Sequence, residues 1–103
     1  MNFSPSARER LELAVEQVSP TATPIKTRLL SAAISLGPLR TEDLPEGEQR
    51  AALDRIKAAL VGSAPEGSSD PLSASLGSMT DDAAEAIAQQ IRDLYGAHTA
   101  GPA

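Results

Sequence analysis

Residues 80–96 constrain the fold more than any other part of the chain, because they combine a helix start, an apolar stripe and a helix stop. Thr80 can cap the first turn with its hydroxyl, and Asp81 and Asp82 place negative charge at the positive end of the helix dipole. Gly96 is typical of the residue that ends a helix. The apolar residues between them recur at helical spacing: Ala84, Ile87, Ala88, Ile91, Leu94 and Tyr95. We therefore predict a helix over residues 80–95, and other helices must cover its stripe, because a helix of this length is marginal alone in water.

Three further segments show the same periodicity, and each begins at or next to a proline. They predict helices over residues 5–18, 24–36 and 45–61, the last with Pro45 at its first position. The second of these is the most hydrophobic, so we place it centrally in the core. The expected core positions are Ala7, Leu11, Ala14, Val15, Val18, Ile25, Leu29, Leu30, Ala33, Ile34, Leu36, Leu53, Ile56, Ala59 and Leu60. The fold class predicted is all-α, a small four-helix bundle.

Residues 62–79 form a long stretch rich in serine, glycine and proline. This is longer than most connections in a compact domain, so we predict a flexible loop, with a partner-binding or lid loop as the alternative. One short helical turn is expected at residues 71–76, where Leu72 and Leu76 could contact the core. Residues 1–96 are then a single helical domain, and residues 97–103 a disordered tail.

The sequence lacks the residue patterns on which most catalytic and metal sites depend. It has no cysteine, and its single histidine, His98, falls in the predicted tail. Asp81, Asp82 and Glu85 are interpreted as charges at a helix start, with a metal-dependent or small-molecule enzyme kept as a residual alternative. There is no G-x-S-x-G and no phosphate-binding G-x-x-x-x-G-K. We predict no catalytic residue, no cofactor and no metal, and hence no enzyme.

The composition of the chain indicates where the protein is located and which class of partner it binds. No stretch is apolar over the length of a membrane span, and the first residues lack a secretory pattern, which predicts a cytoplasmic protein. The alanine-rich composition with more arginine than lysine is typical of bacterial coding. The net charge is −5, which disfavours nucleic acid as a partner.

The favoured hypothesis is a non-catalytic helical protein that acts through protein–protein interaction, in an accessory, chaperone-like or antitoxin-like role. Leu13 lies off the apolar stripe of its helix, and Leu72 and Leu76 lie in a polar segment. We therefore expect these three leucines to contact a partner, which is another protein or, as a homodimer, a second copy of this chain.

The alternative hypothesis is a nucleic-acid-associated regulator. It would present the basic residues of the first two helices on one face, as contacts to an anion or to nucleic acid: Arg8, Arg10, Lys26 and Arg28.

Overall fold

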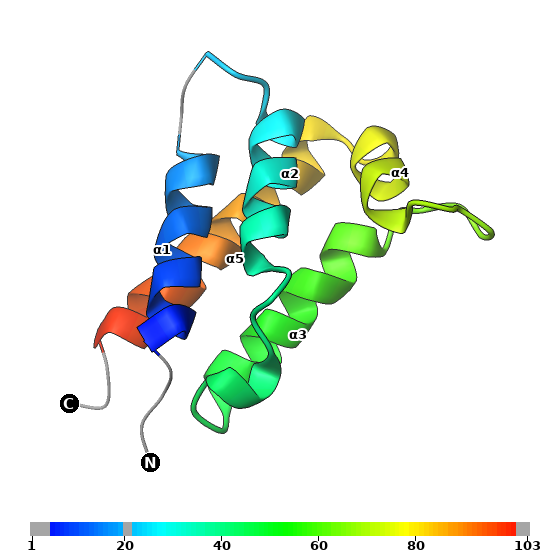
Figure 1. Ribbon diagram of the computed structural model, residues 1–103. Helices are drawn as coiled ribbons and strands as arrows, with labels where there is room; N and C mark the ends of the chain where they lie inside the picture. The colour runs from blue at the N-terminus through cyan, green and yellow to red at the C-terminus, as the bar shows by residue number, and fades with distance from the viewer. Residues whose placement is uncertain (1–4, 20–21, 101–103) are drawn as a thin grey trace.

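A computed structural model describes residues 5–19 and 22–100, and every regular element in those ranges is helical. The elements along the chain are α1 (Pro5–Val18), α2 (Ile25–Leu36), a short 3₁₀ helix η1 (Thr41–Asp43), α3 (Glu48–Val61), α4 (Pro71–Ser78) and α5 (Asp81–Ala100) (Figure 1). The predicted all-α class is confirmed. The predicted number of helices is wrong, because α4 is a fifth α-helix in the described part of the chain.

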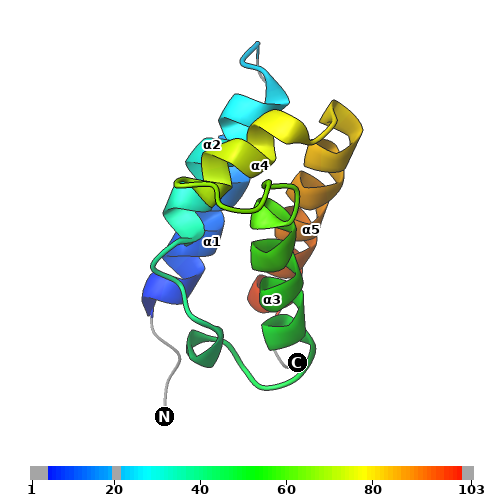
Figure 2. The same cartoon turned by 90° about the vertical axis from the view of Figure 1, so that its right-hand side faces the viewer.

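The centre of the arrangement is α5, which contacts α1, α2 and α3. Helices α1 and α2 pack closely side by side, and α4 contacts both α2 and α3 (Figures 1 and 2). The apolar stripe predicted for α5 supplies five core residues: Ala84, Ile87, Ala88, Ile91 and Leu94. The segment with the clearest sequence signal is therefore the one around which three other helices assemble.

The start of α5 matches its prediction, and its end does not. The backbone N–H of Ala83 donates to the Thr80 hydroxyl at 3.1 Å, which is the expected N-cap. The helix continues through Gly96 to Ala100, so the tail predicted from residue 97 is wrong as far as residue 100. Thr99 Oγ1 donates to the Tyr95 carbonyl at 3.0 Å, and the His98 side chain bonds to α3. These contacts offset the roughly 1 kcal/mol that a glycine costs inside a helix. Residues 101–103 lie outside the described part.

The flexible loop predicted over residues 62–79 is also corrected, because its second half is a helix packed on the core. The Asp70 carboxylate accepts from Ser73 N at 3.3 Å and caps α4, with Pro71 in the first turn. The short turn expected at 71–76 thus extends to the whole of α4. Ser75 is fully buried, and its hydroxyl accepts from Ser63 N at 3.0 Å, which ties the remaining loop to the helix.

The link between α2 and α3 is longer than predicted and is anchored in the core. Helix α3 begins at Glu48 rather than at Pro45, because Gly47 has φ of 110°, a left-handed conformation in which the helix cannot start. Leu39 and Leu44, on either side of η1, are buried in the core although they lie between helices. The link between α2 and α3 is therefore anchored at both ends by leucine.

Because α4 is part of the core, truncating its buried leucine should destabilise the whole domain. Leu76 is 4% exposed, so we expect Leu76→Ala to lower the free energy of unfolding by about 2–3 kcal/mol. The matched control is Leu13→Ala on the exposed side of α1, expected to change it by less than about 0.5 kcal/mol. Urea unfolding followed by circular dichroism measures both. Equal, small effects of the two substitutions would show that residues 71–78 do not stabilise the fold.

Candidate functional site

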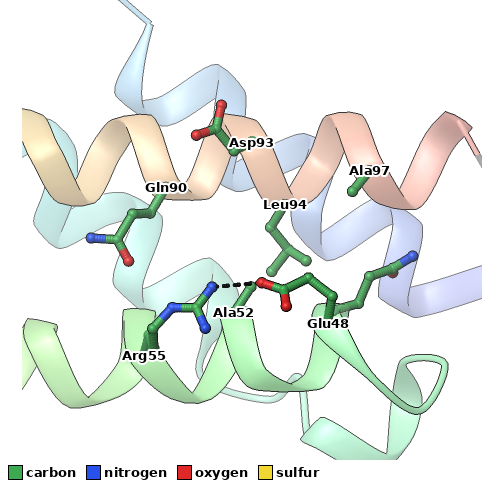
Figure 3. Close-up of a pocket in the computed structure, with 8 residues that line it drawn as sticks. Glu48, Ala52, Arg55, Gln90, Asp93, Leu94 and Ala97 are labelled. Carbon is green, nitrogen blue, oxygen red and sulfur yellow. Dashed lines mark hydrogen bonds and ion pairs between the residues drawn. The ribbon is translucent and has the colours of Figure 1, made fainter.

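A groove of about 360 Å³ runs between α3 and α5 (Figure 3). Its floor is formed by small and apolar side chains, among them Ala52, Leu94 and Ala97, and Leu94 points towards α3. Across its rim the Arg55 guanidinium meets the Glu48 carboxylate at 2.9 Å. Both partners are well exposed, so this ion pair contributes little to stability.

Several polar side chains around this groove are hydrogen-bonded to neighbouring side chains. The Asp93 carboxylate turns away from α3 and accepts from Gln89 Nε2 at 2.9 Å. Gln49 accepts from His98 at 2.8 Å. No deeply buried side-chain nitrogen or oxygen in the described ranges lacks a hydrogen-bond partner. The groove therefore has an apolar floor and a polar rim, and of these polar contacts the one between His98 and Gln49 joins α5 to α3.

The contact between His98 and Gln49 joins the last turn of α5 to the first turn of α3. Because Gln49 Oε1 is an acceptor, the imidazole Nδ1 carries the proton and donates it. Burial lowers the pKa of His98, and the nearby Arg8 guanidinium lowers it further. The carbonyl end of α5 favours a cation at this position, but burial and Arg8 outweigh it.

A second concave region lies where α2, α3 and α4 meet, and it is apolar. We call it the α2–α4 face and define it by four side chains: Leu30, Ile34, Val61 and Leu72. Ile34 is 65% exposed and Val61 is 43% exposed, while Leu30 and Leu72 pack half-buried against the core. Val61 and Leu72 line a hollow of about 200 Å³, and Ile34 lies one helical turn after Leu30 on the same side of α2. Figure 2 looks onto this side of the molecule, with α4 lying over α2.

The charged side chains that line the two hollows of the α2–α4 face, Lys26 and Lys57, are both positive, although the chain is acidic. Lys57 lines the hollow next to Val61, and its ammonium donates to the Leu39 carbonyl. Lys26 lines the continuation of the groove between α2 and α4, where its ammonium is 3.5 Å from the Gly77 carbonyl. Neither α2 nor α4 contains an acidic residue, out of 14 in the chain. This face is therefore an apolar strip with a cation towards each end.

The three leucines predicted to contact a partner have different surroundings. Leu13 is 42% exposed on α1, as expected from its position off the stripe. Leu72 is half-buried and belongs to the α2–α4 face. Leu76 is buried in the core, so in the folded protein its side chain is not available to a partner.

The structure does not bring the four predicted basic residues together. The Arg28 side chain donates to the carbonyls of Thr23 at 2.8 Å and Val18 at 2.9 Å, and so holds the end of α1 against the start of α2. Arg8 and Arg10 lie about eight to ten residues before Val18, roughly 12–15 Å away along α1. The arginines of α1 and the basic residues of α2 therefore occupy opposite ends of the helix pair.

Asp81, Asp82 and Glu85 are exposed at the start of α5, as expected for charges on a helix N-terminus. Residues 5–19 and 22–100 contain no group of three or more histidine, cysteine or acidic side chains placed to hold a metal ion. Among the same residues, none of the helices has the length and apolar character needed to cross a membrane. No family model, no curated protein and no solved structure matches the chain significantly.

Sequence reasoning missed two residues of the α2–α4 face. Ile34 was expected in the core, and the structure corrects this, because α2 has apolar residues around much of its circumference and only one side of it faces α1 and α5. Val61 is the last residue of α3, where periodicity gives little guidance. The lack of acidic residues in residues 25–36 and 71–78 was the available signal for this face.

The lowered pKa of His98 makes the free energy of unfolding depend on pH. The folded state disfavours the imidazolium, so stability from the neutral ring is present above the ordinary pKa of about 6.5 and is lost as pH falls through the lower folded-state pKa. Between about pH 7.5 and about pH 5.5, we expect the native protein to lose more stability than His98→Gln, which has no titrating ring. Urea unfolding at both pH values measures the difference. Equal losses, or a native protein that gains relative to the variant on acidification, would contradict the inferred shift.

Proposed function

We propose that this protein acts without catalysis of its own, by binding a protein through the α2–α4 face. The observation that carries the proposal is the exposure of large aliphatic side chains from two helices, Val61 at 43% on the lining of a hollow and Ile34 at 65% one position after Ala33, which also lines that hollow. Burying such side chains is worth about 1.5–3 kcal/mol each when complete, so a partner that covers them gains much of its binding energy there. Contiguous exposed apolar surface on a small domain is typical of an interaction site.

The form of the site favours an apolar segment with helical spacing as the ligand. The hollow near Val61 and the groove near Lys26 both border α2, and together they follow its length. An amphipathic helix places side chains at positions i, i+3, i+4 and i+7 into such a groove. Accessory, chaperone-like and antitoxin-like proteins all act through contacts of this kind, and we place the protein among them, in the cytoplasm of a bacterium.

Site-specific photocross-linking in the cells that naturally express the protein tests this proposal. A photoreactive residue at position 34 or 61 should give a discrete adduct with a protein, because both side chains point out of the apolar face. The matched control is position 86, an exposed alanine on α5 away from the face, which should give none. A second arm keeps the cross-linker at position 34 and adds Val61→Asp, which should abolish the adduct.

Two results would contradict the proposal. One is the absence of any adduct from positions 34 and 61. The other is the same set of adducts from position 86, which would mean that the cross-links report random collisions rather than docking on the α2–α4 face.

A further inference from the structure

The outward side of α1 carries one exposed leucine surrounded by carboxylates. Glu9, Glu12, Leu13 and Glu16 are spaced i, i+3, i+4 and i+7, so they share one side of the helix, and together they line a shallow hollow. We call these four residues the α1 acidic face. The core residues of α1, among them Leu11 and Ala14, lie on the other side of the helix.

The carboxylates of the α1 acidic face are not neutralised by ion pairs in the part of the chain that the structure describes. None of the three forms an ion pair within residues 5–19 and 22–100. Arg8 lies one helical turn before Glu12, and Arg10 is turned by about 100° from Glu9 around the helix axis, but neither arginine is ion-paired with these carboxylates in the described ranges. Like charges at i,i+3 and i,i+4 repel by a few tenths of a kcal/mol per pair. A cation supplied from outside would remove this repulsion.

The α2–α4 face is complementary to the α1 acidic face in polarity and in charge. It is apolar where the α1 acidic face has Leu13, and it is bordered by Lys26 and Lys57 where the α1 acidic face has carboxylates. Neither α2 nor α4 contributes an acidic residue that would repel the incoming carboxylates. The two surfaces of one chain are therefore complementary in charge.

The α1 acidic face is also short enough to fit within the groove along α2. Glu9 and Glu16 are seven residues apart, which is about 10 Å along a helix, and the groove along α2 from Lys26 to Gly37 extends over about 16 Å. We propose that the occupant of the α2–α4 face is a second copy of this chain, which docks its α1 acidic face there with Leu13 against the apolar side chains. This rests on the proposed function, because it names the partner of the same face.

Such a contact joins two different surfaces, so it is head-to-tail rather than symmetric about a twofold axis. An open assembly of this kind keeps one free α2–α4 face at one end and one free α1 acidic face at the other. Association should therefore continue to add copies as concentration rises, or close into a ring. It should also weaken with salt, because the charges involved are exposed.

Analytical ultracentrifugation of the full chain tests the inference. In about 50 mM salt the average mass should rise with concentration beyond that of a monomer, and about 500 mM salt should weaken association several-fold. Leu13→Asp and Val61→Asp should each be monomeric. An equimolar mixture of the two variants should form dimers and nothing larger, because each variant retains the surface that the other has lost. Both positions are exposed, and circular dichroism verifies that the variants fold.

A charge reversal separates specific pairing from a general effect of net charge. Glu12→Lys reverses a carboxylate of the α1 acidic face and should weaken association about tenfold or more. Glu85→Lys makes the same change of net charge at an exposed position on α5 and should leave association unchanged or slightly stronger, because it lowers the overall negative charge.

A monomer at all concentrations in low salt overturns the inference, and so does a mixture of Leu13→Asp and Val61→Asp that stays monomeric. Self-association of either single variant also overturns it, and would indicate a contact between identical surfaces. If the native chain is monomeric while cross-links from positions 34 and 61 to a different protein persist, the proposed function stands and only the second copy is excluded. If the native chain is monomeric and the cross-links are absent, the proposed function and the second copy as occupant are both excluded.

Discussion

The whole fold depends on one packing interaction, the burial of the apolar stripe of α5 against three other helices. Ile87, Ile91 and Leu94 are almost fully buried where α5 meets α1, α2 and α3. Ala84 and Ala88 complete the stripe, and small side chains at these positions let neighbouring backbones approach closely. A core with so many alanines has little apolar area to bury, so each leucine and isoleucine carries a large share of the stability. This is why the leucines that anchor α4 and the link between α2 and α3 matter to a domain of 103 residues.

The helices that take part in this packing were the ones that could be predicted from the sequence. Long stripes with caps, such as the one that begins at Thr80, gave the class of the fold and most of the core. Helix α4 was predicted only as one short turn at 71–76 inside a flexible loop, because it is eight residues long, has serine at three positions and is held in part by the buried hydroxyl of Ser75. The end of α5 was misplaced because Gly96 usually stops a helix, whereas here a contact with α3, distant in sequence, keeps the chain helical. Both errors come from tertiary contacts that override local preference.

The candidate site was less predictable than the fold. Leu13 and Leu72 were identified, but Ile34 was placed in the core, because a helix that is apolar on several sides does not show which side its neighbours will cover. The charge distribution is the more informative property. Acidic residues are present on α1, α3 and α5 and absent from α2 and α4, so a protein of net charge −5 retains one strip whose two hollows are lined by lysines and by no carboxylate. That segregation, together with the exposed aliphatic side chains, distinguishes this strip from the polar groove between α3 and α5.

Gly96 has a further consequence for the motions of α5. Four residues of α5 follow it, Ala97 to Ala100, and within the described ranges their side-chain hydrogen bonds are the one between His98 and Gln49 and the local bonds of Thr99. Glycine has the largest backbone entropy to regain when a helix unwinds. The final turn therefore opens as a local unit at a free energy well below that of global unfolding, and its amides exchange with solvent before those of residues 84–94. The central helix thus has a rigid part that holds the domain together and a terminal turn that can unwind without disturbing it.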